Sequence, residues 1–322
     1  MKFIRLESKD PYYNLAVEEY LFENIDEDIF MLWQNDKTVV IGKNQNAYAE
    51  VNLPFAKENN IHIARRITGG GAVYHDLGNV NYTFITSTDK ARVLDYEYFT
   101  QPIIKALSTF GIDCKLSGRN DLECQGRKFS GNAQYTKNGR ILHHGTLLFD
   151  SDIDTMSKVL RANKEKLEFK SVKSHSARVT NLRALFGREI DVSTFIDIVE
   201  DFVCNYYNAA KAVVATNDEI SKLCSRNMKS EWIFSDKRYL TDYKSFKHKK
   251  YPFGIVELDI KWNKDVIENI VISGDFFGTL PIEELERMMV GIKVDEIRNI
   301  NVSQYIDKMT SEELIDLIKS DF

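Results

Sequence analysis

Three glycines in a row, preceded by two arginines, form the segment best suited to bind a charged ligand. The segment runs from Arg65 to Asp76 and reads RRITGGGAVYHD. Glycine has no Cβ, so its backbone adopts positive φ and lets a ligand lie against main-chain N–H groups. Arginine adds a fixed positive charge that pairs with phosphate through two hydrogen bonds. The triplet alone is equally compatible with a flexible turn between strands.

The segment does not follow the common nucleotide-loop patterns. It contains no GxxxxGK[ST] sequence, and a strand-like stretch follows the glycines where a dinucleotide-binding fingerprint would open a helix. His75 has no second histidine at metal-ligand spacing. If this segment binds a nucleotide, it does so in a different fold.

A lysine among glycines and serine is the second candidate. Lys128 lies in GRKFSGNA, and SGRNDL precedes it at residues 117–122. Its ammonium group is able to meet two anions at once, such as a carboxylate and an α-phosphate. The alternative interpretation is an exposed lysine in a hairpin, which holds for most lysines of the chain.

Two more segments carry polar side chains. HHGTLL begins at His143, and adjacent residues of a strand point to opposite faces, so His143 and His144 cannot both face one site. The basic, hydroxyl-rich stretch at residues 170–182 is either a solvated loop or a flap that closes over phosphate. The sequence shows no Ser/His/Asp order, no paired-carboxylate motif and no metal-ligand cluster.

The composition narrows the class of protein. With 322 residues, 43% hydrophobic and 28% charged, the chain has room for one large and one smaller domain. A net charge of −5 argues against a nucleic-acid-binding protein. No signal peptide or run of roughly 18 apolar residues is present, so we expect no membrane association. Four cysteines without CxxC or zinc spacing indicate free thiols in a reducing, cytoplasmic environment.

The elements that must position these residues are strands with interspersed helices. A helix is predicted to start at Asp10 and Pro11. A second helix is predicted from the apolar face that begins at Phe99, and it is expected to stop at Gly111. Helical patterns also cover residues 154–160 and 192–207. Apolar, β-branched runs predict strands at residues 29–33, 38–41, 61–64, 80–85, 113–117, 121–124 and 141–149. The pattern favours an α+β fold with a large mixed sheet.

A small second domain is predicted at the C-terminus. Residues 235–250 are rich in Lys and Arg without a sustained apolar period, so we interpret them as a linker. Strand patterns follow at residues 253–262 and 266–273, then a helix from Pro281 and a last helix with the capping box Thr310-x-x-Glu313. We therefore expect a large domain over residues 1–240 and a small α/β domain over residues 248–322.

Taken together and in this order, these segments resemble the lipoate–protein ligase A family. The shared motifs are the paired arginines with GGGAVYHD, then GRNDL, KFSG, HHGTLL and RVTNL, the last at residues 178–182. NLAVEE near the start and VVIG soon after also fit. The resemblance covers most of the chain and implies a catalytic domain of the biotin/lipoate ligase type with a small C-terminal accessory domain.

The resemblance implies an ATP-dependent reaction in two steps. The carboxylate of lipoate attacks the α-phosphate of ATP, which gives lipoyl-AMP and pyrophosphate, and Mg²⁺ accompanies ATP. The lipoyl group then passes to a lysine on a lipoyl domain of a 2-oxoacid dehydrogenase complex, or on the glycine-cleavage H protein. We expect a monomer that binds neither nucleic acid nor membrane.

The resemblance also implies roles for individual residues. Lys128 would be catalytic, because it would offset the repulsion between carboxylate and phosphate, on the order of 4 kcal/mol per unit pair at about 4 Å. The implied ATP or adenylate contacts are Arg66, Gly71, Ala72, Val73, Tyr74, Asn79, Asn120, Asp121, Lys128, Arg178 and Thr180. The implied lipoate contacts are Gly70, Gly71, Lys128 and His144, and Asp121 is a candidate magnesium ligand. A narrow apolar tunnel for the lipoyl tail would draw on Leu32, Val39, Ile41 and Val73.

Related activities are the alternatives. A lipoyl or octanoyl amidotransferase of the same fold would use a cysteine thioester in place of ATP, with Cys114 or Cys124 as the nucleophile. Such enzymes usually lack the C-terminal domain. A non-catalytic paralogue that binds lipoate or a carrier protein would not need Lys128. A biotin–protein ligase is disfavoured because RRIT replaces the glycine-arginine-glycine-arginine loop of that family.

Overall fold

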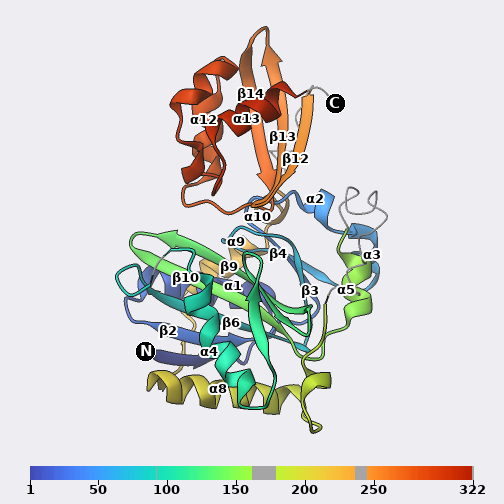
Figure 1. Ribbon diagram of the computed structural model, residues 1–322, viewed down its shortest axis with the longest axis vertical. Coiled ribbons are helices and arrows are strands. Elements are labelled where there is room, and N and C mark those ends of the chain that lie inside the picture. Colours follow the sequence, from blue (N-terminus) through green and yellow to red (C-terminus); the bar gives the residue numbers. More distant parts are fainter. Residues whose placement is uncertain (92, 162–178, 236–244, 321–322) are drawn as a thin grey trace. The chain divides into compact units, whose positions relative to one another are not determined.

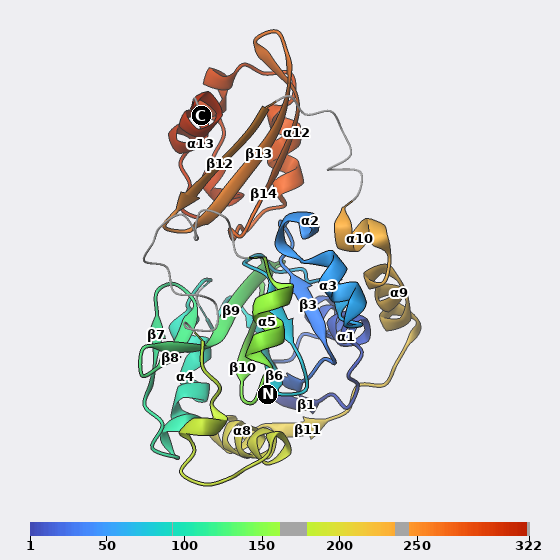
Figure 2. The same cartoon turned by 90° about the vertical axis from the view of Figure 1, so that its right-hand side faces the viewer.

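The computed structural model describes residues 1–91, 93–161, 179–235 and 245–320, and they form two compact units (Figures 1 and 2). The first unit ends at Lys229. The second contains the C-terminal part of the chain and two short segments from within the predicted catalytic domain, one of them the glycine segment. The first unit comprises Met1–Val40, Tyr48–Ala64 and Val73–Lys229, and the second Ile41–Ala47, Arg65–Ala72 and Ser230–Phe322.

An eight-stranded mixed sheet organises the first unit. The strand order is β11-β1-β2-β6-β10-β9-β8-β7. Strand β1 is parallel to β2 and β11, and the neighbours from β2 to β7 are antiparallel. The predicted α+β class with a mixed sheet is therefore confirmed. The strands are β1 (Lys2–Arg5), β2 (Ile29–Trp33), β6 (Asn79–Ser87), β7 (Cys114–Ser117), β8 (Asp121–Cys124), β9 (Arg127–Lys137), β10 (Arg140–Leu148) and β11 (Ala210–Ala212).

The alternation of side chains gives this sheet two different faces. On β6, Val80, Tyr82 and Phe84 point into the main hydrophobic core. Helices α4 (Tyr96–Ser108) and α8 (Val192–Tyr207) cover that face and lie against each other (Figure 1). The residues between them, such as Thr83, point to the opposite face, where α1 (Pro11–Asn24) packs against β6 and β10.

Helix boundaries follow the capping residues that the sequence indicates. The Asp10 carboxylate accepts a hydrogen bond from the Tyr12 N–H at 2.8 Å, and Pro11 occupies the first turn of α1. Asp191 caps α8 in the same way through the Thr194 N–H. The predicted helices at residues 154–160 and 192–207 correspond to α5 (Ile153–Val159) and α8, so both predictions are confirmed.

A three-stranded sheet of order β4-β3-β5 completes the strands near the glycine segment. It consists of β3 (Thr38–Ile41), β4 (His62–Arg65) and β5 (Val73–His75), with Val39 opposite Tyr74. The short helices α2 (Ala47–Glu50) and α3 (Leu53–Glu58) connect β3 to β4, and α9 (Asp218–Asn227) packs on α1.

The C-terminal part of the second unit is a three-stranded antiparallel sheet with helices. It contains β12 (Ser245–Tyr251), β13 (Gly254–Asn263) and β14 (Val266–Gly274), whose apolar side chains form a separate core with α12 (Ile282–Met289) and α13 (Ser311–Lys319). The capping box is confirmed, because Thr310 Oγ1 accepts from the Glu313 N–H at 3.1 Å and Glu313 accepts from the Thr310 N–H at 2.9 Å. Helix α10 (Ser230–Phe234) precedes this module.

The predicted linker at residues 235–250 is wrong over its last part. Residues 245–250 belong to β12, which pairs along its whole length with β13. Among the described strands β12 has one neighbour, and lysines are a common feature of such edge strands because they discourage further pairing. The sequence pattern therefore resembled a solvated linker. Residues 236–244 lie outside the described residues.

Three more strands were missed, β1, β9 and β11, and β9 contains Lys128. No helix among the described residues has the length and apolar character needed to cross a membrane.

Substitution of Gly145 by alanine should destabilise the first unit. A Cβ at this position of β10 would overlap Asn132 Oδ1 and lie 2.7 Å from the Tyr82 ring, both of them buried. Because such overpacking costs about 1–3 kcal/mol, the thermal midpoint of Gly145→Ala should fall measurably. Gly187→Ala is the control, since no described atom lies within 4 Å of its Cβ. Equal melting of the two variants would contradict this account.

Candidate functional site

Lys128 forms an ion pair with Asp121 at one end of the β8–β9 hairpin. The Lys128 Nζ lies 2.8 Å from Asp121 Oδ1. The ladder shifts register between Leu122 and Glu123, so Lys128 pairs with Glu123 while Gly131 pairs with Asp121. A Cβ on Gly131 would lie 3.0 Å from the Lys128 Nζ, so glycine leaves the room that the ammonium group occupies. Both charged side chains stay about one-third exposed, at 36% and 34%.

Thr180 lies beside Lys128 although 52 residues separate them in sequence. The Thr180 N–H donates to the Lys128 carbonyl at 2.8 Å, and Val179 forms a parallel bridge with Lys128. Arg127 also donates to the Val179 carbonyl. The structure thus brings Thr180 to Lys128, whereas Arg178 lies outside the described residues.

Asn120 is held against the same strand by Asn132. The Asn120 carbonyl accepts from the Asn132 N–H and from its Nδ2, both at 2.9 Å, while the Asn120 Nδ2 donates back to the Asn132 carbonyl. The turn that carries Asp121 is therefore fixed directly beside the ion pair. Four of the predicted residues, Asn120, Asp121, Lys128 and Thr180, lie together in this corner of the first unit.

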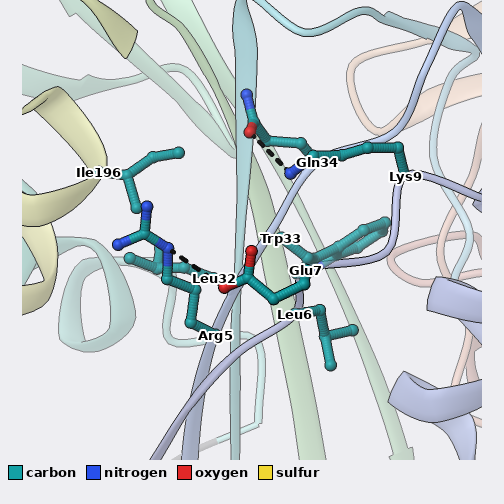
Figure 3. Close-up of a pocket in the computed structure, with 8 residues that line it drawn as sticks. All are labelled: Arg5, Leu6, Glu7, Lys9, Leu32, Trp33, Gln34 and Ile196. Atoms are coloured by element: carbon teal, nitrogen blue, oxygen red, sulfur yellow. Dashed lines mark hydrogen bonds and ion pairs between the residues drawn. The ribbon is translucent and has the colours of Figure 1, made fainter. Parts of the chain in front are cut away.

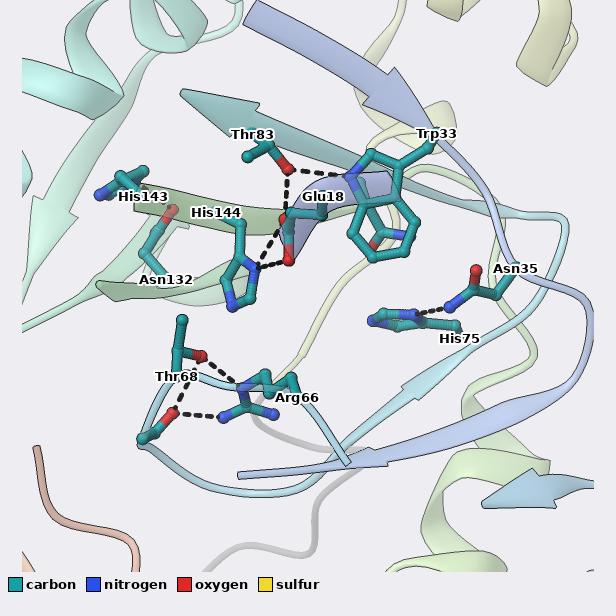
Figure 4. A network of polar contacts seen from close by, with 12 residues as sticks. Glu18, Trp33, Asn35, Arg66, Thr68, His75, Thr83, Asn132, His143 and His144 are labelled. Carbon is teal, nitrogen blue, oxygen red and sulfur yellow. Dashed lines mark hydrogen bonds and ion pairs between the residues drawn. The ribbon is translucent and has the colours of Figure 1, made fainter. Parts of the chain in front are cut away.

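His144 belongs to a buried polar chain on the α1 face of the sheet (Figure 4). Its Nδ1 lies 3.0 and 3.1 Å from the two carboxylate oxygens of Glu18. Thr83 Oγ1 donates to Glu18 at 2.6 Å and accepts from the Trp33 indole N–H at 2.9 Å. The Glu18 side chain is 1% exposed. Because a carboxylate only accepts, it makes His144 Nδ1 a donor and orients the ring.

Glu18 and Trp33 were not predicted as site residues. A signal for Glu18 was present in NLAVEE, since Asn14 and Glu18 are four residues apart on a helix otherwise buried through apolar side chains. Both are buried polar residues, and Asn14 donates to the Gln34 carbonyl and to Asn35 Oδ1. Polar residues on a buried helix face require such partners.

Other predicted residues lie elsewhere in the first unit. Asn79 is fully buried on the same face as Thr83, and its Nδ2 donates to Asn81 Oδ1 at 2.9 Å. Val73 and Tyr74 belong to β5, and the Tyr74 side chain is buried. The expected tunnel residue Leu32 lies in the main hydrophobic core, on the face opposite to Trp33.

Arg65–Ala72 of the glycine segment belong to the second unit, and there Arg66 is bound by its own loop. The Arg66 Nη2 donates to the carbonyls of Gly69 and Gly71 at 2.7 and 2.9 Å, and its Nε donates to Thr68 Oγ1 at 2.9 Å (Figure 4). Arg65 has a different surrounding, since its buried guanidinium donates to the carbonyls of Gly42, Gln45 and Ile233. The two adjacent arginines therefore differ in their contacts. Arg66 contacts its own loop, whereas Arg65 connects separate segments of the second unit.

The three glycines differ in whether the surrounding structure requires a residue without a side chain. A Cβ on Gly69 would lie 2.5 Å from the Phe276 carbonyl, and Gly70 adopts a φ of 90°, which side chains disfavour. Around a Cβ on Gly71, no atom of the described residues lies within 4 Å. The first two positions need glycine for packing and backbone conformation, and Gly71 borders open space.

Comparisons with known proteins identify these motifs. Residues 10–203 match the model of the lipoyl protein ligase A/B catalytic domain, and residues 241–318 match that of the bacterial lipoate protein ligase C-terminus. The chain is 37% identical to the lipoate-protein ligase LplJ of Bacillus subtilis, over 96% of this chain and 97% of that protein. This chain belongs to the lipoate–protein ligase family. The predicted family is confirmed, and the protein is a ligase.

Another relative and several solved structures agree. Lipoate–protein ligase 1 of Staphylococcus aureus is 34% identical over 90% of both chains. LipL1 of P. falciparum, solved in complex with lipoate, shares the fold with a TM-score of 0.81, 24% identity and coverage of 99% and 98%. The bipartite ligase of Thermoplasma acidophilum gives a TM-score of 0.64, 26% identity and coverage of 72% and 95%. Lipoate-protein ligase A bound with ATP gives 0.61, 24% identity and coverage of 72% and 98%.

A small cavity in this ligase lies near Trp33 (Figure 3). Its volume is about 30 Å³, and Lys9 donates to Gln34 Oε1 beside it at 3.1 Å. Ligand pockets are roughly ten times larger, so this cavity has room for water but not for a lipoyl chain. The lining residues are Arg5, Leu6, Glu7, Lys9, Leu32, Trp33, Gln34 and Ile196.

The described part of the ligase contains no cluster of three or more His, Cys, Asp or Glu side chains that could hold a metal ion. Asp121, the candidate magnesium ligand, forms its ion pair with Lys128.

Removal of the Glu18 carboxylate should destabilise the ligase much more than removal of a surface carboxylate. Glu18→Ala leaves the Thr83 hydroxyl and His144 Nδ1 without their acceptor in a buried site, which costs about 1–3 kcal/mol. Glu23→Ala is the matched control on α1, because its contact with Lys137 is exposed and worth about 1 kcal/mol or less. Denaturant unfolding measures both variants, and a smaller loss for Glu18→Ala than for Glu23→Ala would contradict this prediction.

Proposed function

We propose that this ligase activates lipoate with ATP and transfers the lipoyl group to a lysine of a carrier protein. In the first step a lipoate carboxylate oxygen forms a bond to the α-phosphorus of ATP, and pyrophosphate leaves. In the second step a lysine amine displaces AMP from lipoyl-AMP and releases a proton. The family supports this reaction, and structures of related proteins contain lipoate or ATP.

The ion pair of Lys128 is the observation that carries the proposal. An ammonium group that is one-third exposed and held by a single carboxylate is able to exchange that partner for substrate anions. We propose that Lys128 binds both the lipoate carboxylate and the α-phosphate, so that it offsets their repulsion and stabilises charge that develops at phosphorus. Thr180 and Asn120 would contact the nucleotide from the same corner, with Arg178 on the adjoining segment.

The glycine segment is proposed to bind the nucleotide through its main chain. Gly71 borders open space, and its neighbour Ala72 directly precedes β5, which contains Val73 and Tyr74. Arg66 is already oriented by three hydrogen bonds, so little side-chain entropy would be lost when it contacts phosphate. We assign ATP and adenylate contacts to Arg66, Gly71, Ala72, Val73, Tyr74 and Asn79, and lipoate contacts to Gly70 and Gly71.

His144 is proposed to contact the lipoyl group. Its ring is held by Glu18 on a buried face that also presents the Trp33 indole, an apolar surface suited to a thin aliphatic chain. Glu18 and Trp33 therefore extend the proposed lipoate-binding set. The carboxylate of Glu18 acts here by orienting the histidine.

Magnesium is proposed to enter with ATP. Mg²⁺ is usually held by one or two carboxylates together with phosphate oxygens, and Asp121 is a carboxylate that meets this requirement beside Lys128. The bound cation would neutralise charge on the phosphates.

The carrier proteins are proposed to be lipoyl domains of 2-oxoacid dehydrogenase complexes and the glycine-cleavage H protein. The Thermoplasma ligase was solved as part of a lipoylation system with its E2 lipoyl domain, which supports this class of partner. We further propose a monomeric, cytoplasmic enzyme with a catalytic domain at residues 1–240 and an accessory domain at 248–322. The matched ranges of the two family models support this division.

The cysteines do not favour an amidotransferase. Cys114 and Cys124 are buried in the main core, opposite each other on β7 and β8. Burial and the neighbouring thiol raise the pKa of Cys114 to about 12, so its reactive thiolate is scarce at neutral pH. A cysteine thioester mechanism needs an accessible nucleophile, which Cys114 does not provide.

Exchange of labelled pyrophosphate into ATP tests the proposed first step. Exchange should depend on lipoate, be weaker with octanoate and be absent with biotin. Acylation of a carrier protein that depends on lipoate but proceeds without ATP would refute the ligase reaction in favour of an amidotransferase.

Lys128→Ala should lower the exchange rate by at least about 100-fold, the usual loss when one preorganised charge is removed from the transition state. Folding should be nearly unchanged, because the lost ion pair is exposed. Lys137→Ala is the matched control on β9, since it also removes an exposed pair, with Glu23. If both variants exchange pyrophosphate at similar rates, Lys128 has no part in the mechanism.

A further inference from the structure

The first histidine of the His-His motif, His143, lies on the opposite face of the sheet from His144 and contacts no substrate in the proposed reaction. It is fully buried, and its ring stacks on Phe99 at a centroid distance of 4.7 Å. An apolar side chain would fill such a position without the cost of desolvating two ring nitrogens. Both nitrogens have partners, Gln134 at 3.0 Å from Nδ1 and Asn132 at 3.3 Å from Nε2.

The partners of His143 determine the direction of each hydrogen bond in a series that runs from Leu94 to Asn120. The Leu94 N–H donates to Gln134 Oε1 at 2.7 Å, so the Gln134 amide nitrogen faces His143 and donates to Nδ1. At the other end, the Asn120 carbonyl accepts from Asn132 Nδ2, so Asn132 Oδ1 faces His143 and accepts from Nε2. Both ends require the same neutral tautomer, with the proton on Nε2.

A proton on Nδ1 would place two donors opposite each other, His143 and the Gln134 amide. Burial lowers the pKa of His143 well below its usual range, which agrees with a ring that stays neutral. The chain therefore keeps one orientation of the Asn132 amide, and Tyr82 reinforces it by donating to the same oxygen.

The series of hydrogen bonds ends at Asn120, which directly precedes Asp121, the partner of Lys128. Asn132 holds the Asn120 carbonyl through two hydrogen bonds, and the next residue, Asp121, contacts the Lys128 Nζ at 2.8 Å. If the Asn132 amide turned over, its oxygen would face the Asn120 carbonyl, and two acceptors would repel each other. The orientation of the Asn132 amide thus decides whether its side chain adds to the main-chain hydrogen bond that holds the Asn120 turn.

We propose that His143 is a positioning residue for the first half-reaction. Its Nε2–H fixes the Asn132 amide, Asn132 fixes the main chain at Asn120, and Asp121 is thereby held in place to orient Lys128. This inference rests on the proposed role of Lys128. It adds a buried hydrogen-bond chain, from Leu94 to Asn120, through which His143 sets the geometry of the charged pair without itself contacting substrate.

His143→Phe tests the proposal, because phenylalanine keeps a ring stacked on Phe99 and removes both polar atoms. In lipoate-dependent pyrophosphate exchange, we expect kcat to fall about tenfold per folded molecule, with the KM for lipoate changed less than twofold. Ile141→Val is the matched control, since it thins the same core on the same face of β10 and alters no hydrogen bond of the chain. His143→Gln, which keeps a donor and an acceptor, should restore part of the rate.

A double-mutant cycle with Asp121→Asn separates positioning from a general loss of stability. If His143 acts through Asp121, His143→Phe should lower kcat less than twofold in the Asp121→Asn background. Full multiplication of the two effects would overturn the proposal, as would an equal loss of kcat in Ile141→Val.

Amide hydrogen exchange gives a result that does not depend on activity. In His143→Phe, exchange at residues 118–121 and 132 should rise at least tenfold relative to the rest of the sheet, and Ile141→Val should not show this local rise. Unchanged protection in His143→Phe would overturn the hydrogen-bond chain. Absence of exchange activity in the unaltered protein would instead refute the proposed reaction, and the hydrogen-exchange result would still decide the structural claim.

Discussion

The antiparallel pairing of β6, β10 and β9 is the constraint on which the site depends. Nine consecutive residues of β10 pair with β6, and six of them also pair with β9. Since side chains alternate between the two faces, this register alone decides that His144 meets Glu18 while His143 meets Asn132. A slip of one residue would exchange the faces of the two histidines. His143 would then point toward α1 and Glu18, and His144 toward the main core.

Interdigitation of side chains across the strands fixes that register. Gly145 lies opposite both Tyr82 and Asn132, and the space where its side chain would be is filled by theirs. Only a register that places glycine there accommodates the Tyr82 ring and the Asn132 amide. The register shift between Leu122 and Glu123 lies between the pairs that contain Asp121 and Lys128, and the side chains of these two residues meet across it.

Local patterns predicted the elements well and the site only in part. Helix α8 and strand β2 follow from apolar periodicity and capping, which are properties of neighbouring residues. Glu18 was missed because its meaning comes from Thr83 and His144, which the sheet brings to it from distant parts of the sequence. The different surroundings of Arg65 and Arg66 also depend on tertiary partners. Strand parity separates Leu32 from Trp33 but does not say which face of the sheet carries the site.

Two polar pairs of the first unit, Glu18–His144 and Lys128–Asp121, differ in burial and therefore in what they contribute to this ligase. The Glu18–His144 pair is almost fully buried, so breaking it leaves polar atoms without water, and it persists as part of the framework. The Lys128–Asp121 pair is one-third exposed, and such pairs contribute about 1 kcal/mol or less to stability. Lys128 can therefore leave Asp121 for a substrate anion at little cost. The proposed role of Lys128 in catalysis needs this weakly held pair, and the proposed role of the buried hydrogen bonds behind Asn120 is to position Asp121.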